Sequence, residues 1–312
     1  MSVLSELRAV TRADKGAKRT NERHRDNRAA YLFMLPWLIG LAVITIGPML
    51  ASLYLAFTNY NLLQPPDFTG LANIQRMIGD DSLHHSLGVT LLYVCVSVPL
   101  QLAVALLLAL MLDKGLRGLA LYRSIFYLPS LLGSSVAVAI LWKQVFGAKG
   151  IVNGALALVG IHADSWIANP STALWTLIAL NVWAFGSPMV IFLAGLRQIP
   201  TNYYEAARID GASRLQLLRN ITLPLLTPII FFNLVLQVIN AFQSFTQAYV
   251  ISSGTGGPVD STLFYTLYLY TQGFVNFNMG YASSMAWLLL LIIGAFTALN
   301  FWASRFWVVY DD

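Results

Sequence analysis

Six long apolar runs alternate with short polar segments along the chain. A helix needs about 20 residues to cross the hydrocarbon core of a membrane, and each run is long enough to do so. The pattern therefore predicts an all-α integral membrane protein with six transmembrane helices. The expected helices cover residues 31–57, 86–112, 122–146, 172–195, 224–250 and 281–304.

The fifth run carries a regular stripe of uncharged polar residues. Their spacing of 4, 3, 4 and 3 is the period of one face of an α-helix. Such side chains could hydrogen-bond neighbouring helices, each contributing about 0.6 kcal/mol, or they could line a water-filled path whose donors and acceptors match those of a sugar. Five polar residues on one face exceed what packing usually needs, which favours the path. The stripe consists of Asn233, Gln237, Asn240, Ser244 and Gln247.

Composition and charge agree with a membrane protein. Charged residues make up 11% of the chain and its mean hydropathy is +0.64, whereas soluble domains carry about 25% charged residues. Sixteen of the nineteen Lys and Arg residues fall on one side of the expected helices. The positive-inside rule then places both termini in the cytoplasm. Residues 1–30 are expected to be a basic cytoplasmic tail that touches anionic headgroups, followed by the first transmembrane helix at 31–57.

Several function classes are disfavoured by what the sequence lacks. The six runs contain no Asp or Glu, and their two basic residues, Arg123 and Lys143, lie near the ends of the third run. Ion-coupled carriers usually need intramembrane ionisable groups, so an ion-gradient-driven solute carrier is the weaker alternative. No GxxxxGK[ST] loop is present to cradle a nucleotide. The basic residues flank membrane segments, which argues against nucleic-acid binding. We expect a transport subunit that is not an enzyme and binds no cofactor or metal.

The loop "QIPTNYYEAARIDGASRLQLLRNITLPLLTP" at 198–228 is expected on the cytoplasmic side. A helix can begin after Pro200, Gly211 is a plausible stop, and a second short helix leads to the fifth run. The loop matches the EAA signature of ABC importer permeases, a long and gapped pattern. The matching positions are Glu205, Ala206, Ala207, Gly211, Ile221, Leu223 and Pro224.

Other stretches resemble the carbohydrate-uptake class of these permeases, similar to the maltose, glycerol-phosphate and multiple-sugar membrane subunits. They are "FTGLANI" at 68–74, "NVWAFGSPMVIFLAGLRQIPTNYYEAA" at 181–207 and "GTGGP" at 254–258. The resemblance implies a type I ABC importer permease architecture, with a core of five transmembrane helices at 86–304 and a coupling loop at 198–224.

The resemblance also implies function, site and partners. The chain would be the permease subunit of an ATP-driven importer for a sugar, oligosaccharide or polyol in a bacterial or archaeal inner membrane. Its expected partners are a second homologous permease, two copies of a cytoplasmic ATPase that uses ATP and Mg²⁺, and an extracytoplasmic solute-binding protein. Sugar contacts carried over from the maltose permease fall on Asn181, Gln237, Asn240, Ala241 and Ser244, three of which belong to the stripe. Together with Gln247 of the stripe, the expected substrate-binding residues are Asn181, Gln237, Asn240, Ser244 and Gln247.

The charge asymmetry makes a topology prediction. In a background where the single cysteine is replaced (Cys95→Ala), Asp260→Cys should react with a membrane-impermeant thiol reagent in intact cells, whereas Ser213→Cys should react only after lysis. The measurement is gel-shift labelling of the two variants. The opposite labelling pattern would reverse the assigned orientation.

Overall fold

The computed structural model describes residues 31–113, 118–133, 135–160 and 164–309, so the expected tail at 1–30 lies outside the described residues. The chain divides into two compact units, Met1–Ala56 and Phe57–Asp312. In the first unit, residues 31–55 form one apolar helix with π-helical geometry at η1 (Leu41–Ile46) and α-helical geometry at α2 (Gly47–Leu55). Pro48 lacks a backbone N–H and cannot donate a hydrogen bond within the helix. The π-helical segment η1 lies just before it in the chain.

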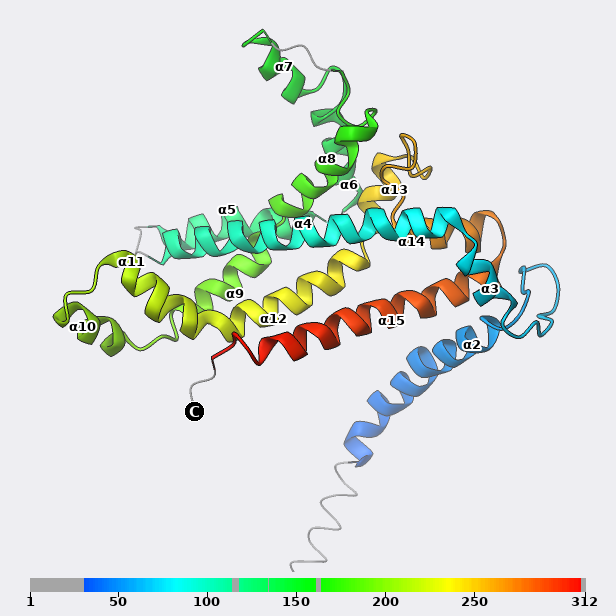
Figure 1. Ribbon diagram of the computed structural model, residues 1–312, viewed down its shortest axis with the longest axis horizontal. Coiled ribbons are helices and arrows are strands. Elements are labelled where there is room, and N and C mark those ends of the chain that lie inside the picture. The colour runs from blue at the N-terminus through cyan, green and yellow to red at the C-terminus, as the bar shows by residue number, and fades with distance from the viewer. Residues whose placement is uncertain (1–30, 114–117, 134, 161–163, 310–312) are drawn as a thin grey trace, which may run out of the picture. The chain divides into compact units, whose positions relative to one another are not determined.

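The second unit is built around α4 (Asp81–Leu112), which packs against α14 (Tyr265–Tyr270) near its start and most extensively against three longer helices. These are α8 (Pro170–Trp183), α9 (Gly186–Leu196) and α12 (Leu223–Phe242). The helix α15 (Met279–Ser304) packs along α12, as Figure 1 shows. The buried side chains of these helices, with Phe192, Phe242 and Met285 fully enclosed, form the core of this unit.

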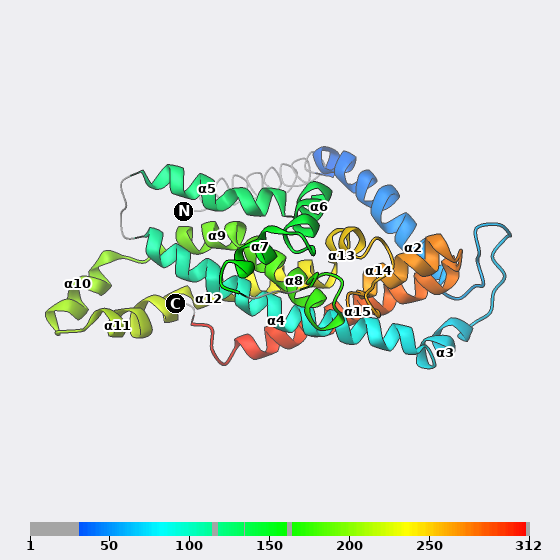
Figure 2. The same cartoon turned by 90° about the horizontal axis from the view of Figure 1, so that it is seen from above.

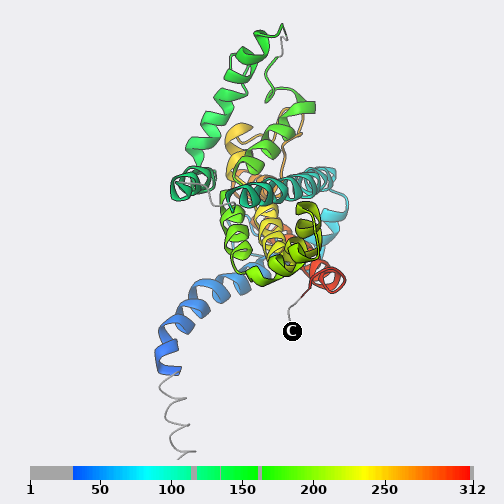
Figure 3. The ribbon, with the colours of Figure 1, turned by 90° about the vertical axis from the view of Figure 1, so that its left-hand side faces the viewer.

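Three of the expected spans are not continuous helices. The expectation of one helix at 122–146 is wrong, because α5 (Leu119–Leu132) and α6 (Val136–Val145) meet at an angle of 97°. The Ser135 hydroxyl caps α6 by accepting a hydrogen bond from the Val138 amide (3.3 Å). Figure 3 shows α5 to one side of α4 and α9. When short interruptions are counted within a span, the described residues hold five helical segments long and apolar enough to cross a membrane, or six if the bent pair counts as one span.

The fourth and fifth spans are interrupted as well. The fourth breaks at Ala184 and Phe185, between α8 and α9. Pro188 explains this break, because it lacks the N–H that would bond the Ala184 carbonyl four residues earlier in a continuous helix. The fifth breaks at residues 243–245, between α12 and α13 (Thr246–Ile251). The stripe therefore does not lie on one continuous helix face, since Ser244 and Gln247 follow the end of α12.

Short elements complete the unit at both ends of the long helices. One end carries α10 (Thr201–Ile209), α11 (Arg214–Leu217) and the π-helical turn η2 (Leu218–Thr222), which extend beyond the ends of α4 and α12 in Figures 1 and 2. The opposite end carries three more elements, which are α3 (Ala72–Ile78), α14 (Tyr265–Tyr270) and η3 (Thr271–Val275). The short helix α7 (Ile151–Ala157) packs against α6 and lies apart from that end in Figure 1.

A hydrogen-bond network around Asp80 joins the elements at that opposite end. One carboxylate oxygen accepts from the hydroxyls of Tyr268 (2.7 Å) and Tyr281 (2.6 Å), and the other accepts from the Leu83 amide (3.0 Å), which caps α4. The Arg76 guanidinium lies over the Tyr281 ring, 4.2 Å from its centroid. The Asp80 side chain therefore ties α4, α14 and α15 together, and Arg76 joins α3 to them through the Tyr281 ring.

The network changes the acidity of Asp80. Burial acts to raise its pKa, but the hydrogen bonds from Tyr281, Tyr268 and Leu83, together with the Arg76 charge, outweigh burial and lower the pKa below its ordinary value of 3.8. Burial and the Asp80 carboxylate raise the pKa of Tyr268 to about 12. The ionised Asp80 and the neutral Tyr268 are thus the forms that the fold favours.

Removing the Asp80 charge should destabilise this end of the protein. Asp80→Asn keeps a helix-capping side chain but loses the charge that the two tyrosines bond, so unfolding should cost about 1–3 kcal/mol less. A folded-state pKa below 3.8 stabilises the wild type above pH 4, and this contribution is lost as pH falls through the lowered pKa. Thermal unfolding of the purified protein against pH measures both effects. Asp81→Asn, which removes an exposed neighbouring carboxylate, is the matched control and should stay near wild type.

Candidate functional site

A polar cavity lies where the three broken spans meet. Its volume is about 460 Å³, within the range of small-molecule sites. The described residues that line it carry no charge. They come from α4, α5, α8, α9, α12 and α13 and the break after α12, and the polar ones are Tyr93, Gln101, Ser130, Asn181, Ser187, Gln237, Asn240, Gln243, Ser244, Thr246 and Gln247.

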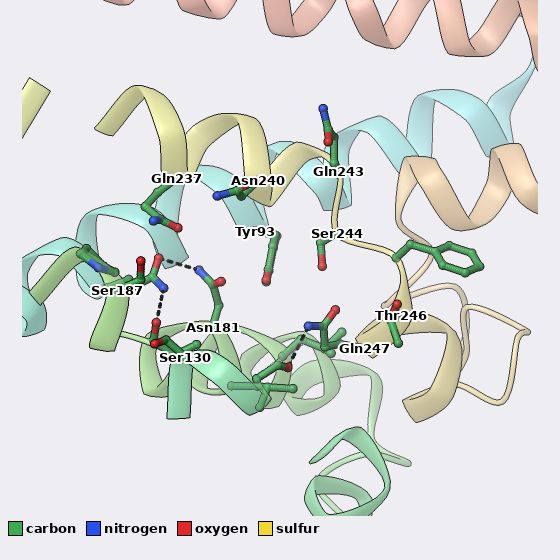
Figure 4. Close-up of a pocket in the computed structure, with 17 residues that line it drawn as sticks. Tyr93, Ser130, Asn181, Ser187, Gln237, Asn240, Gln243, Ser244, Thr246 and Gln247 are labelled. Atoms are coloured by element: carbon green, nitrogen blue, oxygen red, sulfur yellow. Dashed lines mark hydrogen bonds between the residues drawn. The ribbon is translucent and has the colours of Figure 1, made fainter. Parts of the chain in front are cut away.

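The structure brings all five expected substrate-binding residues to this one cavity. Gln237 and Asn240 of α12 face Asn181 of α8 across it, and Ser244 and Gln247 line the end beyond α12 (Figure 4). The remaining residue of the stripe, Asn233, does not reach the cavity. Asn233 is completely buried, and its amide donates to the Ile229 carbonyl one turn earlier (3.1 Å). The packing interpretation of the stripe therefore applies to Asn233.

Side chains satisfy the backbone carbonyls that the helix breaks leave unpaired. The Gln101 amide donates to the Ala184 carbonyl (3.0 Å), and the Gln247 amide donates to the Gly133 carbonyl at the end of α5 (3.0 Å). The Thr266 hydroxyl donates to the Ser244 carbonyl after α12. An unpaired carbonyl away from water costs several kcal/mol, so these three contacts stabilise the cavity wall.

Two amides that face the cavity remain available to a ligand, whereas the Gln243 side chain points away from the other lining residues (Figure 4). Neither Gln237 nor Asn240 forms a side-chain hydrogen bond with any described residue, and Asn181 makes one long contact, to Gln101 (3.5 Å). Asn240 is exposed and Gln237 is half-buried. Each primary amide offers two donors and one acceptor. The cavity can therefore exchange several hydrogen bonds with a polar, uncharged group.

Six polar residues of the wall were not expected from the sequence. They are Tyr93, Gln101, Ser130, Ser187, Gln243 and Thr246. Gln101 was the most visible of them, as an isolated amide inside a long apolar run. Ser130 and Ser187 border small residues and prolines and carry no periodic signal. Only the breaks in the helices bring them to the cavity.

Close backbone contacts hold the broken helices together. A Cβ atom at Gly186, the first residue of α9, would lie 2.6 Å from the Phe126 carbonyl oxygen and 2.8 Å from the Ser130 hydroxyl of α5. A Cβ at Gly195 would collide with the Ile229 side chain of α12. Glycine at these two positions lets α9 approach both neighbours, which positions Ser130 and Ser187 at the cavity.

The expected coupling loop folds as a helix–turn–helix. Glu205, Ala206 and Ala207 lie in α10, and Gly211 follows that helix with φ at +79°, a conformation that glycine adopts without strain. Ser213 and Gln216 form a capping box that starts α11. Ile221 lies in η2, while Leu223 and Pro224 begin α12. The first helix and its stop before Gly211 agree with the expectation, whereas the expected second short helix is not separate, because α11 continues through η2 into α12. The role of the loop in coupling stays a prediction.

The loop is joined to α12 and presents an open surface. The Tyr204 hydroxyl of α10 lies 3.0 Å from the Thr222 hydroxyl, which donates in turn to the Leu217 carbonyl (3.3 Å). No residue of α10 is buried, and Ile209 is 87% exposed. The Glu205 carboxylate forms no ion pair within the described part of the chain. A hydrogen bond thus joins the exposed, amphipathic α10 to the residue that precedes α12, the helix that lines the cavity.

Comparison with known proteins places the chain in a family. Residues 85–307 match the family described as binding-protein-dependent transport system inner membrane component. The chain is 52% identical over 297 residues to the probable ABC transporter permease protein YesP of Bacillus subtilis, covering 95% of this chain and 96% of that protein. It is 33% identical to the lactose transport system permease protein LacF of Rhizobium radiobacter, covering 88% and 93%. It is 29% identical to the trehalose/maltose transport system permease protein MalF of Thermococcus litoralis, covering 91% and 96%.

Solved structures share the fold. A chain of a bacterial alginate ABC transporter, crystallised with an alginate pentasaccharide-bound periplasmic protein, aligns with a TM-score of 0.78 at 21% identity, covering 90% of this chain and 95% of that chain. A second structure of a bacterial ABC transporter involved in alginate import aligns with a TM-score of 0.75 at 21% identity, covering 92% and 98%. These likenesses confirm the all-helical permease architecture.

The chain belongs to the family of binding-protein-dependent transport system inner membrane components. Like its relatives, it is a membrane-spanning ABC permease subunit, and such a subunit is not itself an enzyme. The expectations of an inner-membrane location and of an ABC permease are confirmed.

Proposed function

We propose that this chain, with a second homologous permease, forms the path of an ATP-driven importer for a sugar, oligosaccharide or related polyol. The observation that carries the proposal is the uncharged cavity, whose unpaired Gln237 and Asn240 amides match the donors and acceptors of sugar hydroxyls. Asn181, Ser244 and the side-chain oxygen of Gln247, whose nitrogen donates to the Gly133 carbonyl, complete the set of proposed contacts. The relatives include proteins named for the transport of lactose and of trehalose and maltose, which supports the same class of solute.

The exposed α10 supports a cytoplasmic ATPase as partner. In this proposal two ATPase copies use ATP and Mg²⁺, one of them receives α10 of this chain, and Glu205 to Gly211 transmit the closure of the ATPase pair. Tyr204 and Thr222 would carry that movement to α12 and hence to the cavity wall. An extracytoplasmic binding protein delivers the solute at the opposite end. Both termini would lie in the cytoplasm, as the distribution of Lys and Arg predicts.

Family membership leaves the ion-gradient carrier without support. An ATP-driven importer needs ATP and no ion gradient, whereas a gradient-driven carrier needs the gradient and no ATP. Uptake into proteoliposomes that contain the purified complex should require enclosed ATP and should persist when ionophores collapse all ion gradients. Uptake that follows the gradient without ATP would contradict the proposal.

Asn240→Leu should impair transport more than folding. The wild-type amide has no protein partner among the described residues, so its loss leaves only the solute hydroxyl unpaired, at about 1–3 kcal/mol in the transport step. Gln247→Leu is the contrasting variant, because it leaves the Gly133 carbonyl unpaired and should lower thermal stability. Thermal unfolding and ATP-driven uptake per assembled complex are measured for both. An unstable Asn240→Leu complex with normal uptake would assign this residue to packing.

Gly211→Pro should uncouple ATP hydrolysis from transport while the chain still inserts. Proline fixes φ near −65° and removes a donor, whereas Gly211 has φ at +79° and its amide donates to the Arg208 carbonyl (3.1 Å). Gly211→Asn is the matched control. Asparagine tolerates the left-handed conformation, and nothing lies within 4 Å of the Cβ atom that it would add. Uptake and ATPase rate per assembled complex test this. Wild-type uptake by Gly211→Pro would refute a coupling role for the turn.

A further inference from the structure

A second cleft lies beside the polar cavity, between α5 and α9. Its volume is about 330 Å³, at the lower end of the range of ligand sites. The Ser187 side chain borders both spaces, so the cleft adjoins the proposed solute path. The residues that line it are Arg123, Ser124, Tyr127, Ser187, Val190 and Ile191.

The charge of Arg123 is not balanced within the described part of the chain. Its Nε atom is enclosed and has no hydrogen-bond acceptor there, and no described carboxylate lies within 4 Å of it. Two other arginines have partners: Arg197 lies 3.9 Å from an Asp113 oxygen, and the Arg305 Nε donates to the Trp302 carbonyl (3.1 Å). A guanidinium keeps its charge in proteins, so a half-enclosed one without an anion is costly.

The surroundings of Arg123 suit an anion with oxygen atoms. A guanidinium presents a planar fork of N–H donors that matches a carboxylate or phosphate group. Tyr127 and Ser187 line the same cleft, and each carries a hydroxyl that can donate to further oxygens. A membrane-facing arginine that served only to orient the chain would need no hydroxyl-lined cleft.

We propose that the Arg123 cleft is a binding site for an oxyanion, with Arg123 as its cation and Tyr127 and Ser187 as its neutral donors. Two sources share this chemistry. One is the carboxylate of an acidic sugar that passes from the cavity across Ser187, and this source rests on the proposed function. The other is the phosphate of an anionic phospholipid, since basic pockets between membrane helices bind such headgroups.

Direct binding to the assembled complex in neutral detergent tests the site without requiring transport. For the solute source, the thermal unfolding midpoint is titrated with sodium galacturonate, against galactose with equal sodium chloride. For the lipid source, native mass spectrometry counts retained phosphatidylglycerol against phosphatidylcholine. The variants are Arg123→Gln, Arg123→Lys and Tyr127→Phe. Arg305→Gln removes an exposed charge elsewhere and is the matched control.

We expect at least one of the two probes to bind the wild type and Arg305→Gln alike. For that probe, Arg123→Gln should weaken binding about tenfold or more, as loss of a charge-assisted hydrogen bond implies, and Arg123→Lys should weaken it less. A loss confined to galacturonate names the solute as source, and a loss confined to phosphatidylglycerol names the lipid. Equal behaviour of all variants toward both probes overturns the site. ATP-driven uptake by the wild type is measured separately, so failure of the proposed function is distinguishable from failure of this site.

Discussion

The central constraint on this protein is that a helix broken inside a membrane must find partners for its backbone carbonyls. Lipid offers none, and each unpaired group costs several kcal/mol. Three spans of the second unit are broken, and a side-chain donor meets a carbonyl at each break: Gln101 at Ala184, Gln247 at Gly133, and Thr266 at Ser244. The position of the cavity follows, because irregular backbone is tolerated where it borders a polar space.

The amide residues of the cavity consequently divide into two groups, one that supports the backbone and one that we propose contacts the solute. Gln101 and Gln247 are committed to the backbone, so their amides hold the wall in shape. Gln237 and Asn240 lie on a regular stretch of α12, where the helix already satisfies its own carbonyls. Their amides are therefore left for a solute. The same residue type serves as structural support in one place and as a proposed contact in another, and the difference lies in the neighbouring backbone.

The helix α12 connects the two regions to which we assign function. It begins at the coupling loop, where Tyr204 contacts Thr222, and it ends at the cavity, where Asn240 is exposed. A helix transmits displacement along its axis because its backbone hydrogen bonds make it stiff. Close packing at Gly195 joins α9 to the same helix, so a movement of the loop would reach both walls of the cavity together.

Hydrophobic runs and local motifs were enough to predict several features. The length of the apolar runs predicted a membrane protein, because the thickness of the hydrocarbon core sets the length of a spanning helix. Pro200 and Gly211 predicted the first helix of the loop and its stop, because they act through local backbone geometry. The 3–4 spacing predicted a polar face on α12. These features depend on residues close together in the chain.

The breaks, the bend between α5 and α6 and the extra cavity residues depend on tertiary structure. Pro188 was a local signal for one break, but whether a proline kinks or interrupts a membrane helix depends on a donor such as Gln101, 83 residues away from Ala184. Likewise, the sequence could not separate Asn233, which packing encloses, from Asn240, which the cavity exposes. Hydrophobic periodicity records which face of a helix is polar, whereas the partners of that face come from chain segments far away.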